Sequence, residues 1–318
     1  MTINTTPIRK MIKLIPGARA LKRRLIKEYP IDTYDDLPSR TESQILSIIR
    51  HEAHRIEKSM YNHIFEKKRH IYEVKKKRVV DSFRELESRG FDLHEDQTVL
   101  WAMQIIDSFD DLDQFIDAGS TPAKPFAPEN AEAFVEFVRQ RRSVRVWADD
   151  QPSEAELRAI AEKMIDAARW APTSGNRQPW RFRIITDTTE KDLLKGLKEE
   201  HCTSSPLLIF VGMRADHYGA LGNEECSIYI DAGAATMQMV LTAHRCGLGV
   251  CWNHFAMDLI RSRPANEVAY RHFAASLGID AGLVPVAIIC IGRPKFIPPT
   301  PARSATRDLM IRREIPRK

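Results

Sequence analysis

The chain has 318 residues, 43% of them hydrophobic and 29% charged, enough to bury one large core or two moderate ones. Its 48 Lys and Arg residues against 43 Asp and Glu leave a net charge of +5, which does not favour a nucleic acid as the partner of the whole molecule. Five cysteines in so long a chain predict neither a disulfide scaffold nor a paired-cysteine metal site, and they favour a reducing, cytoplasmic location.

Basic and apolar side chains alternate along residues 9–27, a pattern typical of an amphipathic helix that can lie on anionic lipid. Pro16 and Gly17 interrupt this pattern, and packing against an acidic stretch of the same chain, Asp107 to Asp117, explains the basic residues equally well. We therefore predict that the acidic stretch folds back near the basic helices or lies beside a second subunit. Peripheral membrane contact is the less favoured alternative.

Apolar residues recur at helical spacing from Glu42 to Glu87 without any Gly or Pro. This run is long for one globular helix, so we expect it to break near the basic residues 75–78 or to extend past the core onto another subunit. Only His51 and His54 lie one helical turn apart, without a full set of further ligands, so solvated or capping histidines are expected and no metal site is predicted.

Three prolines and one glycine fall within residues 119–128, and they can continue neither a helix nor a central strand. We place a domain boundary here, which separates an all-α N-terminal region at residues 1–125 from a second domain at residues 126–318. The second domain alternates helical and strand patterns, which predicts a layered fold of the α/β or α+β class.

The elements expected in the second domain begin with a helix after Ser153, which is the predicted N-cap because acidic residues follow it directly. A stretch at residues 228–246 is apolar on nearly every side, so we expect a helix that is buried on nearly every side, a candidate for a dimer core. Short apolar runs suited to buried strands lie at residues 182–185, 207–211, 249–252 and 285–291.

The second domain has no catalytic carboxylate pair, nucleophile elbow or zinc-protease motif, so its chemistry is expected to come from a cofactor. The guanidinium groups of residues 141–145 can clamp a phosphate, although a charged run of this kind is also typical of a solvated helix face. The loop at residues 171–180 offers small hydroxyls and amides between two prolines. It can bind a ligand or simply connect a helix to a strand.

Taken in order, the short motifs of the second domain resemble the nitroreductase superfamily of FMN-dependent oxidoreductases, and the likeness covers about residues 135–315. The resemblance implies that family's fold, a central mainly antiparallel or mixed sheet flanked by helices, and a homodimer with two flavins at its interface. The motifs are Arg-Arg-Ser-Val-Arg (141–145), Ala-Pro-Thr-Ser-Gly-Asn-Arg-Gln-Pro-Trp (171–180), Asp-Ala-Gly-Ala-Ala (231–235), Gly-Leu-Gly-Val-Cys-Trp (247–252), Ile-Gly-Arg-Pro (291–294) and Pro-Ala-Arg (301–303).

The same resemblance implies roles for individual residues. Those at the FMN phosphate end are Arg141, Arg142, Ser143 and Arg303, and Arg145 reaches toward the pyrimidine edge of the ring. Those that contact the flavin from the other subunit are Pro172, Thr173, Ser174 and Asn176. Those beside the ring near N5 are Trp252, Asn253 and His254. Many relatives carry Ile-Gly in place of Asn253 and His254, so substrate access is expected to differ here.

The implied reaction is a ping-pong transfer of hydride from NADH or NADPH, through flavin N5, to an electron-poor small molecule such as a nitroaromatic or a quinone. One alternative keeps the flavin fold but changes the reaction to dehalogenation, azoline oxidation or flavin consumption, with His254 as a candidate proton donor. Another is a non-catalytic flavin-fold scaffold in a polysaccharide-related pathway. Residues 51–58 resemble an N-terminal helical extension of some bacterial nitroreductase-like proteins, several from polysaccharide-biosynthesis neighbourhoods, and this likeness implies no activity.

Overall fold

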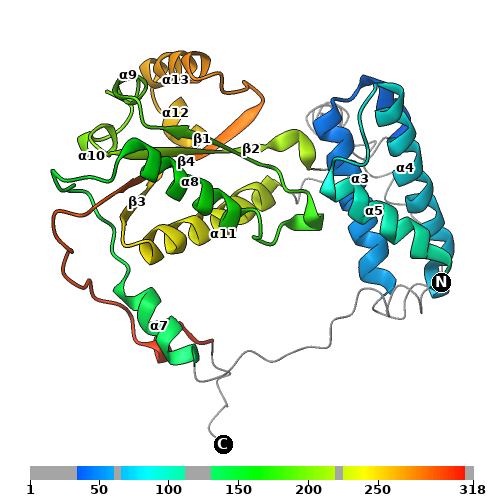
Figure 1. Cartoon of the computed structure of the whole chain (residues 1–318), viewed down its shortest axis with the longest axis horizontal. Coiled ribbons are helices and arrows are strands. Elements are labelled where there is room, and N and C mark those ends of the chain that lie inside the picture. Colours follow the sequence, from blue (N-terminus) through cyan, green and yellow to red (C-terminus); the bar gives the residue numbers. More distant parts are fainter. Residues whose placement is uncertain (1–33, 61–65, 112–129, 219–224, 312–318) are drawn as a thin grey trace, which may run out of the picture.

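The computed structural model describes residues 34–60, 66–111, 130–218 and 225–311, which form a helical region and a layered region of helices and strands (Figure 1). The basic stretch at residues 9–27 and the expected domain boundary at residues 119–128 lie outside the described residues. Among the described helices, none is long and apolar enough to cross a membrane.

The helical region buries its own apolar core between three helices, α3 (Glu42–Met60), α4 (Arg69–Ser88) and α5 (Gln97–Asp107). Short 3-10 turns accompany them, namely η2 (Tyr34–Ser39), η3 (Glu66–Lys68) and η4 (Ser108–Asp110). The expected break near residues 75–78 was wrong, because α4 continues through these residues and the long apolar run divides before it, between α3 and α4. The residues of this core include Ile45, Ile49, Ile56, Val79, Leu86, Val99 and Ile105.

Lys75 belongs to the interior of the helical region, where its Nζ lies 2.9 Å from Oε2 of Glu52 on α3. Burial opposes ionisation of Glu52, but the adjoining His51 and Lys75 outweigh it and lower the pKa of Glu52 to about 2. Burial lowers the pKa of Lys75 more than the charge of Glu52 raises it. The pair therefore stabilises the charged form of Glu52 more than the charged form of Lys75. This buried pair explains why α4 does not break at its basic run.

We expect Lys75→Met to lower the free energy of unfolding by about 3 kcal/mol, because it leaves the buried Glu52 carboxylate without its nearest cation. Urea unfolding followed by circular dichroism measures the loss. The matched control is Lys77→Met on the same helix, since Lys77 is 77% exposed and pairs only across the surface with Asp81. Equal unfolding midpoints for the two variants would contradict the assignment.

The acidic stretch folds back onto the basic helices at Asp110, which confirms the expectation for that residue. Its carboxylate accepts a hydrogen bond from Arg69 and lies 3.0 Å from Nζ of Lys76, both on α4. These two cations also lie over the ring of Phe109. Residues 112–117 of the stretch are outside the described part of the chain.

A four-stranded sheet forms the centre of the second region, with strand order β1-β2-β4-β3 and antiparallel pairing throughout. This confirms the predicted α+β fold and the position of each expected strand. The strands are β1 (Trp180–Ile185), β2 (Leu207–Arg214), β3 (Gly249–His254) and β4 (Leu283–Gly292).

Both faces of the sheet are covered, because alternate residues of each central strand pack into different cores. On β2, Leu207 and Ile209 face α8 (Glu154–Ala168) and α11 (Glu225–Arg245), whereas Leu208 and Phe210 face the opposite layer. Ser153 caps α8 as expected and forms a capping box with Glu156. The opposite layer contains α9 (Thr188–Asp192), α10 (Glu200–Thr203), α12 (Met257–Arg261) and α13 (Pro264–Ser276).

The long helix α11 confirms the helix expected at residues 228–246, but in the single chain it is not buried on every side. One stripe of its surface stays half-buried or exposed, at intervals of three and four residues. The helix α7 (Asn130–Gln140) lies outside the two layers and has no buried residue (Figure 1). It contacts the end of α11, where the ring of Phe137 stacks on His244 with ring centroids 4.7 Å apart. The exposed stripe comprises Cys226, Tyr229, Ile230, Gly233, Ala234, Met237 and Leu241.

The candidate functional site

The guanidinium-rich segment at residues 141–145 adds to the edge of the sheet beside β3. Ser143 pairs with Val250 in a parallel bridge, and the backbone N–H of Val144 donates to the Val250 carbonyl at 3.0 Å. The close approach requires a glycine on β3, since a Cβ at Gly249 would lie 2.6 Å from Cγ2 of Val144. The motif at 247–252 therefore positions the motif at 141–145.

A hollow of about 210 Å³ opens between these two motifs, at the C-terminal end of α11. Burial and repulsion from Arg303 and Arg142 lower the pKa of Arg141, so three guanidinium groups share this place. Nε of Arg142 is buried without a hydrogen-bond partner, whereas its Nη1 donates to the Arg141 carbonyl and its Nη2 to the Thr300 hydroxyl. Within the described ranges no carboxylate lies in an ion pair with any of the three arginines. Positive groups gathered without a counter-charge fit an anion. Lining residues include Arg141, Arg142, His244, Gly247 and Pro294.

The loop after α8 adopts a conformation that most residues avoid. Three residues have positive φ, namely Gly175 at 62°, Asn176 at 54° and Gln178 at 49°. Asp231 on α11 holds this loop, because its Oδ2 accepts hydrogen bonds from Ser174 N at 3.0 Å and from the Tyr218 hydroxyl at 2.7 Å. The loop is thus preorganised, as a ligand-binding loop requires.

Helix α3 packs directly behind this loop. Nη1 of Arg177 donates to the Ser174 carbonyl at 2.8 Å, and its Nη2 lies 3.2 Å from Nε2 of His51. A Cβ at Gly175 would lie 2.3 Å from Cδ2 of His51, so only glycine fits there. The expectation of a solvated or capping His51 was wrong, because its side chain is 13% exposed and burial lowers its pKa.

The end of β3 directs its side chains to opposite faces of the sheet. Trp252 and His254 are exposed, and Nε2 of His254 lies 2.9 Å from Oδ1 of Asp258. Asn253 is buried on the other face, where its Oδ1 lies 2.9 Å from Nε2 of His201. Because side chains alternate along a strand, Asn253 cannot present its side chain beside those of Trp252 and His254.

One chain holds the two predicted binding segments at opposite ends of α11. The loop at residues 172–176 contacts Asp231 near the helix start, whereas the arginines adjoin the residues that follow Arg245 at the helix end. At about 1.5 Å per residue, these two helix positions lie roughly 20 Å apart. The structure therefore brings Arg141, Arg142 and Arg303 together, but it does not bring the loop to them within a single chain.

Several residues around these segments escaped the sequence analysis. Tyr218 and Arg177 stabilise the loop, and His244 lines the hollow, where burial and the neighbouring arginines lower its pKa. Arg145 lines a separate open hollow with Trp147 and His201. The only sequence signal for His201 was the adjacent run of Glu199, Glu200 and Cys202, all polar or thiol groups just before β2.

A sequence profile of the nitroreductase family matches residues 138–205 and 193–293. The chain is 27% identical over 172 residues to a proposed NADH dehydrogenase/NAD(P)H nitroreductase of Archaeoglobus fulgidus, a match that covers 52% of this chain and 87% of the relative. A similarly named protein of Methanothermobacter thermautotrophicus is 26% identical over 182 residues, covering 55% of this chain and 81% of the relative.

A solved structure of a proposed nitroreductase in complex with FMN, from Desulfovibrio desulfuricans, is 24% identical. It covers 60% of this chain and 100% of that chain, with a TM-score of 0.47. On the family match and the archaeal relatives, this chain belongs to the nitroreductase family through its second region, which confirms the resemblance predicted from the motifs. The helices α3, α4 and α5 lie outside the residues that the family profile matches.

Proposed function

We propose that this protein is an FMN-dependent NAD(P)H oxidoreductase that reduces an electron-poor small molecule. The observation that carries the proposal is the group of three arginines without carboxylate partners, among the described residues, beside the hollow at the end of α11. A phosphate monoester supplies the charge and the acceptor oxygens that such a group lacks. The two archaeal relatives are named NAD(P)H nitroreductases, which supports the same choice of cofactor and donor.

The residues present fit FMN. Arg141, Arg142 and Arg303 would hold its phosphate, and the unpartnered Nε of Arg142 is a donor still to be satisfied. Ser143 borders this group on the edge strand, and Arg145 would supply positive charge near the pyrimidine edge, where a reduced flavin is anionic. When bound, FMN supplies the acceptor for hydride at its N5, and the protein contributes placement and electrostatics.

A second copy of the chain would complete the site. In a two-fold dimer with antiparallel α11 helices, the Asp231 end of one helix lies beside the Arg245 end of its partner. The loop with Pro172, Thr173, Ser174 and Asn176 would then meet the partner's arginines across the interface. The exposed apolar stripe of α11 supports this arrangement, because it gives two helices a surface to bury against each other.

Spectroscopy of the full chain tests the proposed function. We expect a yellow protein that releases FMN on denaturation, is bleached by NADH or NADPH without oxygen, and recovers its colour when a quinone is added. Parallel double-reciprocal plots are expected for the ping-pong order, and intersecting plots would contradict it. A colourless protein that takes up no added FMN would contradict the whole proposal and favour the scaffold alternative.

The proposed dimer interface along α11 can be tested separately from the flavin. We expect Ile230→Glu to shift the protein from dimer to monomer in light scattering after gel filtration, and to weaken FMN binding as well, because a charge would be buried unpaired at the interface. The matched control is Val268→Glu on α13, since Ile230 and Val268 are both 68% exposed in the single chain. An unchanged dimer in the Ile230 variant would show that α11 does not form the interface.

A further inference from the structure

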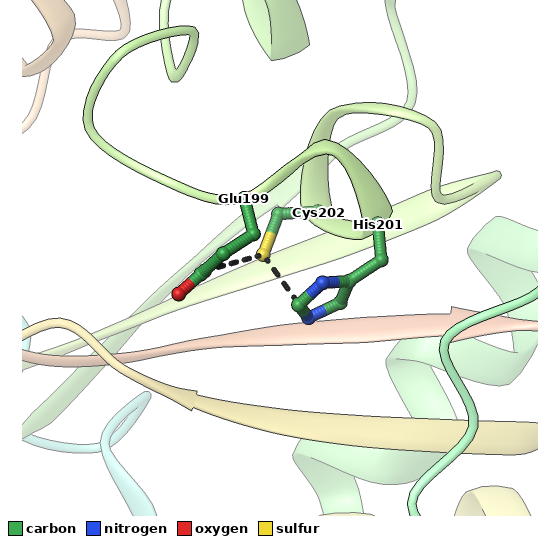
Figure 2. A group of neighbouring side chains, drawn as sticks. All are labelled: Glu199, His201 and Cys202. Carbon is green, nitrogen blue, oxygen red and sulfur yellow. Dashed lines mark hydrogen bonds between the residues drawn. The ribbon is translucent and has the colours of Figure 1, made fainter.

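A group of thiol, imidazole and carboxylate side chains lies on the sheet face opposite α11, where α10 meets β3 and β4. Cys202 and His201 belong to α10, Glu199 precedes this helix, and Cys251 belongs to β3. Figure 2 shows Glu199, His201 and Cys202 directed toward one another. Cys202 is 0% exposed and Cys251 1% exposed, whereas Glu199 is open to solvent.

The donor atoms of Glu199, His201 and Cys202 are spaced as the ligands of one small cation, and Cys251 approaches the group at His201. Nε2 of His201 lies 3.7 Å from Sγ of Cys202 and 3.7 Å from Sγ of Cys251. Sγ of Cys202 lies 4.0 Å from Oε2 of Glu199, and the ligand atoms of Glu199, His201 and Cys202 are all within 4.8 Å of one another. A tetrahedral zinc ion separates its nitrogen and sulfur ligands by about 3.5 Å, so little movement would be needed.

Asn253 lies beside this group and contacts the imidazole nitrogen that the metal would take. Oδ1 of Asn253 lies 2.9 Å from Nε2 of His201, and its Nδ2 donates to Sγ of Cys290 at 3.1 Å. Cys290 stands directly opposite Cys251 in the pairing of β3 with β4. Buried cysteines often serve only as small apolar residues, but such residues need no imidazole and carboxylate among them.

Charge and access also suit a cation of this kind. Two thiolates and one carboxylate exceed the charge of a divalent ion by one, and one nearby cation, Lys198, offsets this excess. Nζ of Lys198 lies 3.4 Å from Oε2 of Glu199. His201 lines the open hollow that also contains Trp147, so an ion can reach the group from solvent.

We propose that Glu199, His201, Cys202 and Cys251 form a zinc site that ties α10 to β3. Zinc fits because mixed sulfur and nitrogen donors select it over magnesium or calcium, which prefer oxygen. On binding, the two thiols ionise and release their protons to solvent, and Nε2 of His201 exchanges its contact with Asn253 for the metal. The site goes beyond the proposed oxidoreductase activity and does not depend on it.

Cobalt and zinc titrations of the full-length protein test the proposal. We expect added Co²⁺ to produce a thiolate-to-metal charge-transfer band and the visible bands of tetrahedral cobalt, and Zn²⁺ to abolish both. We also expect Zn²⁺, but not Mg²⁺, to raise the Tm, because an ion that binds only the folded state stabilises it. Absence of the charge-transfer band would overturn the proposal without reliance on any variant.

Substitutions locate the ion. We expect Cys202→Ser and Cys251→Ser each to weaken zinc binding by more than about tenfold, measured against a chromophoric chelator, and to reduce the cobalt charge-transfer band. Cys246→Ser is the matched control, because Cys246 is an exposed cysteine that directly follows α11, on the other face of the sheet from the four donors. Zinc affinity that is unchanged in the first two variants, or lowered as much in the control, would overturn the assignment.

Discussion

Arg141→Ala is expected to weaken FMN binding by about 100-fold, the largest effect of a single substitution that we predict on the proposed function. A charge-assisted hydrogen bond to phosphate is worth up to about 3 kcal/mol, and each 1.4 kcal/mol is tenfold in affinity. The guanidinium of Arg141 has no other counter-ion among the described residues, so its interaction energy would be available to the phosphate. Fluorescence quenching of FMN by the flavin-free protein measures the affinity.

Riboflavin distinguishes a phosphate contact from general damage, because it has the same ring but no phosphate. We expect the wild-type protein and the Arg141 variant to bind riboflavin with similar affinity, so that the loss appears with FMN alone. The control is Arg271→Ala on α13, which removes an exposed guanidinium paired with Glu267. An equal loss of riboflavin and FMN affinity would show that Arg141 does not bind the phosphate.

The stability of the protein is expected to fall by about 1.4 kcal/mol for each pH unit between pH 6.5 and about 3, on account of His217. Burial lowers the pKa of His217 to about 3, and the attraction of Asp216 does not offset it. The unfolded chain binds this proton below pH 6.5 while the folded chain does not, so its contribution to stability is complete above pH 6.5 and is lost as the pH falls.

His217 lies where the helical region meets the sheet region. Protonation of its imidazole at low pH is therefore expected to weaken the contact between these two regions. Its Nε2 lies 3.0 Å from the Ser43 hydroxyl, and the Ser47 hydroxyl donates to its carbonyl at 3.4 Å, both residues of α3. We expect His217→Gln to flatten the pH dependence of the urea midpoint. The exposed His272→Gln is the control. A pH profile of His217→Gln that matches the wild type would contradict this source of the acid effect.

Local patterns in the sequence were sufficient to predict most of the secondary structure of the second region. The four strands, the capped helix α8 and the long helix α11 all lie where period and capping place them. These patterns report which side of each element is apolar, and burial of that side stabilises the element in the folded chain. The break was expected near the basic residues 75–78, but α4 runs through them and the division falls before Arg69. One of those residues, Lys75, has a buried partner 23 positions earlier in the chain.

The family and the motifs at residues 141–145, 171–180 and 247–252 could also be read from the sequence, since each motif is contiguous. Groups of side chains that come from segments far apart in the sequence could not be predicted in this way. His51 reaches Arg177 across 126 positions, and Cys251 approaches His201 across 50. Neither contact produces a periodic or local pattern in the sequence. The sequence analysis therefore predicted neither the packing of α3 behind the loop nor the group of thiols.

The amino-acid order alone determined that this chain contains a nitroreductase-type domain and which of its segments carry the arginines and the loop. Tertiary structure decided how those segments are arranged: three like charges gathered at one end of α11, the loop at the other end, and an unshared apolar stripe between them. The reason is physical. Short-range periodicity encodes which face of an element is apolar, whereas the distance between two charges depends on every element packed between them.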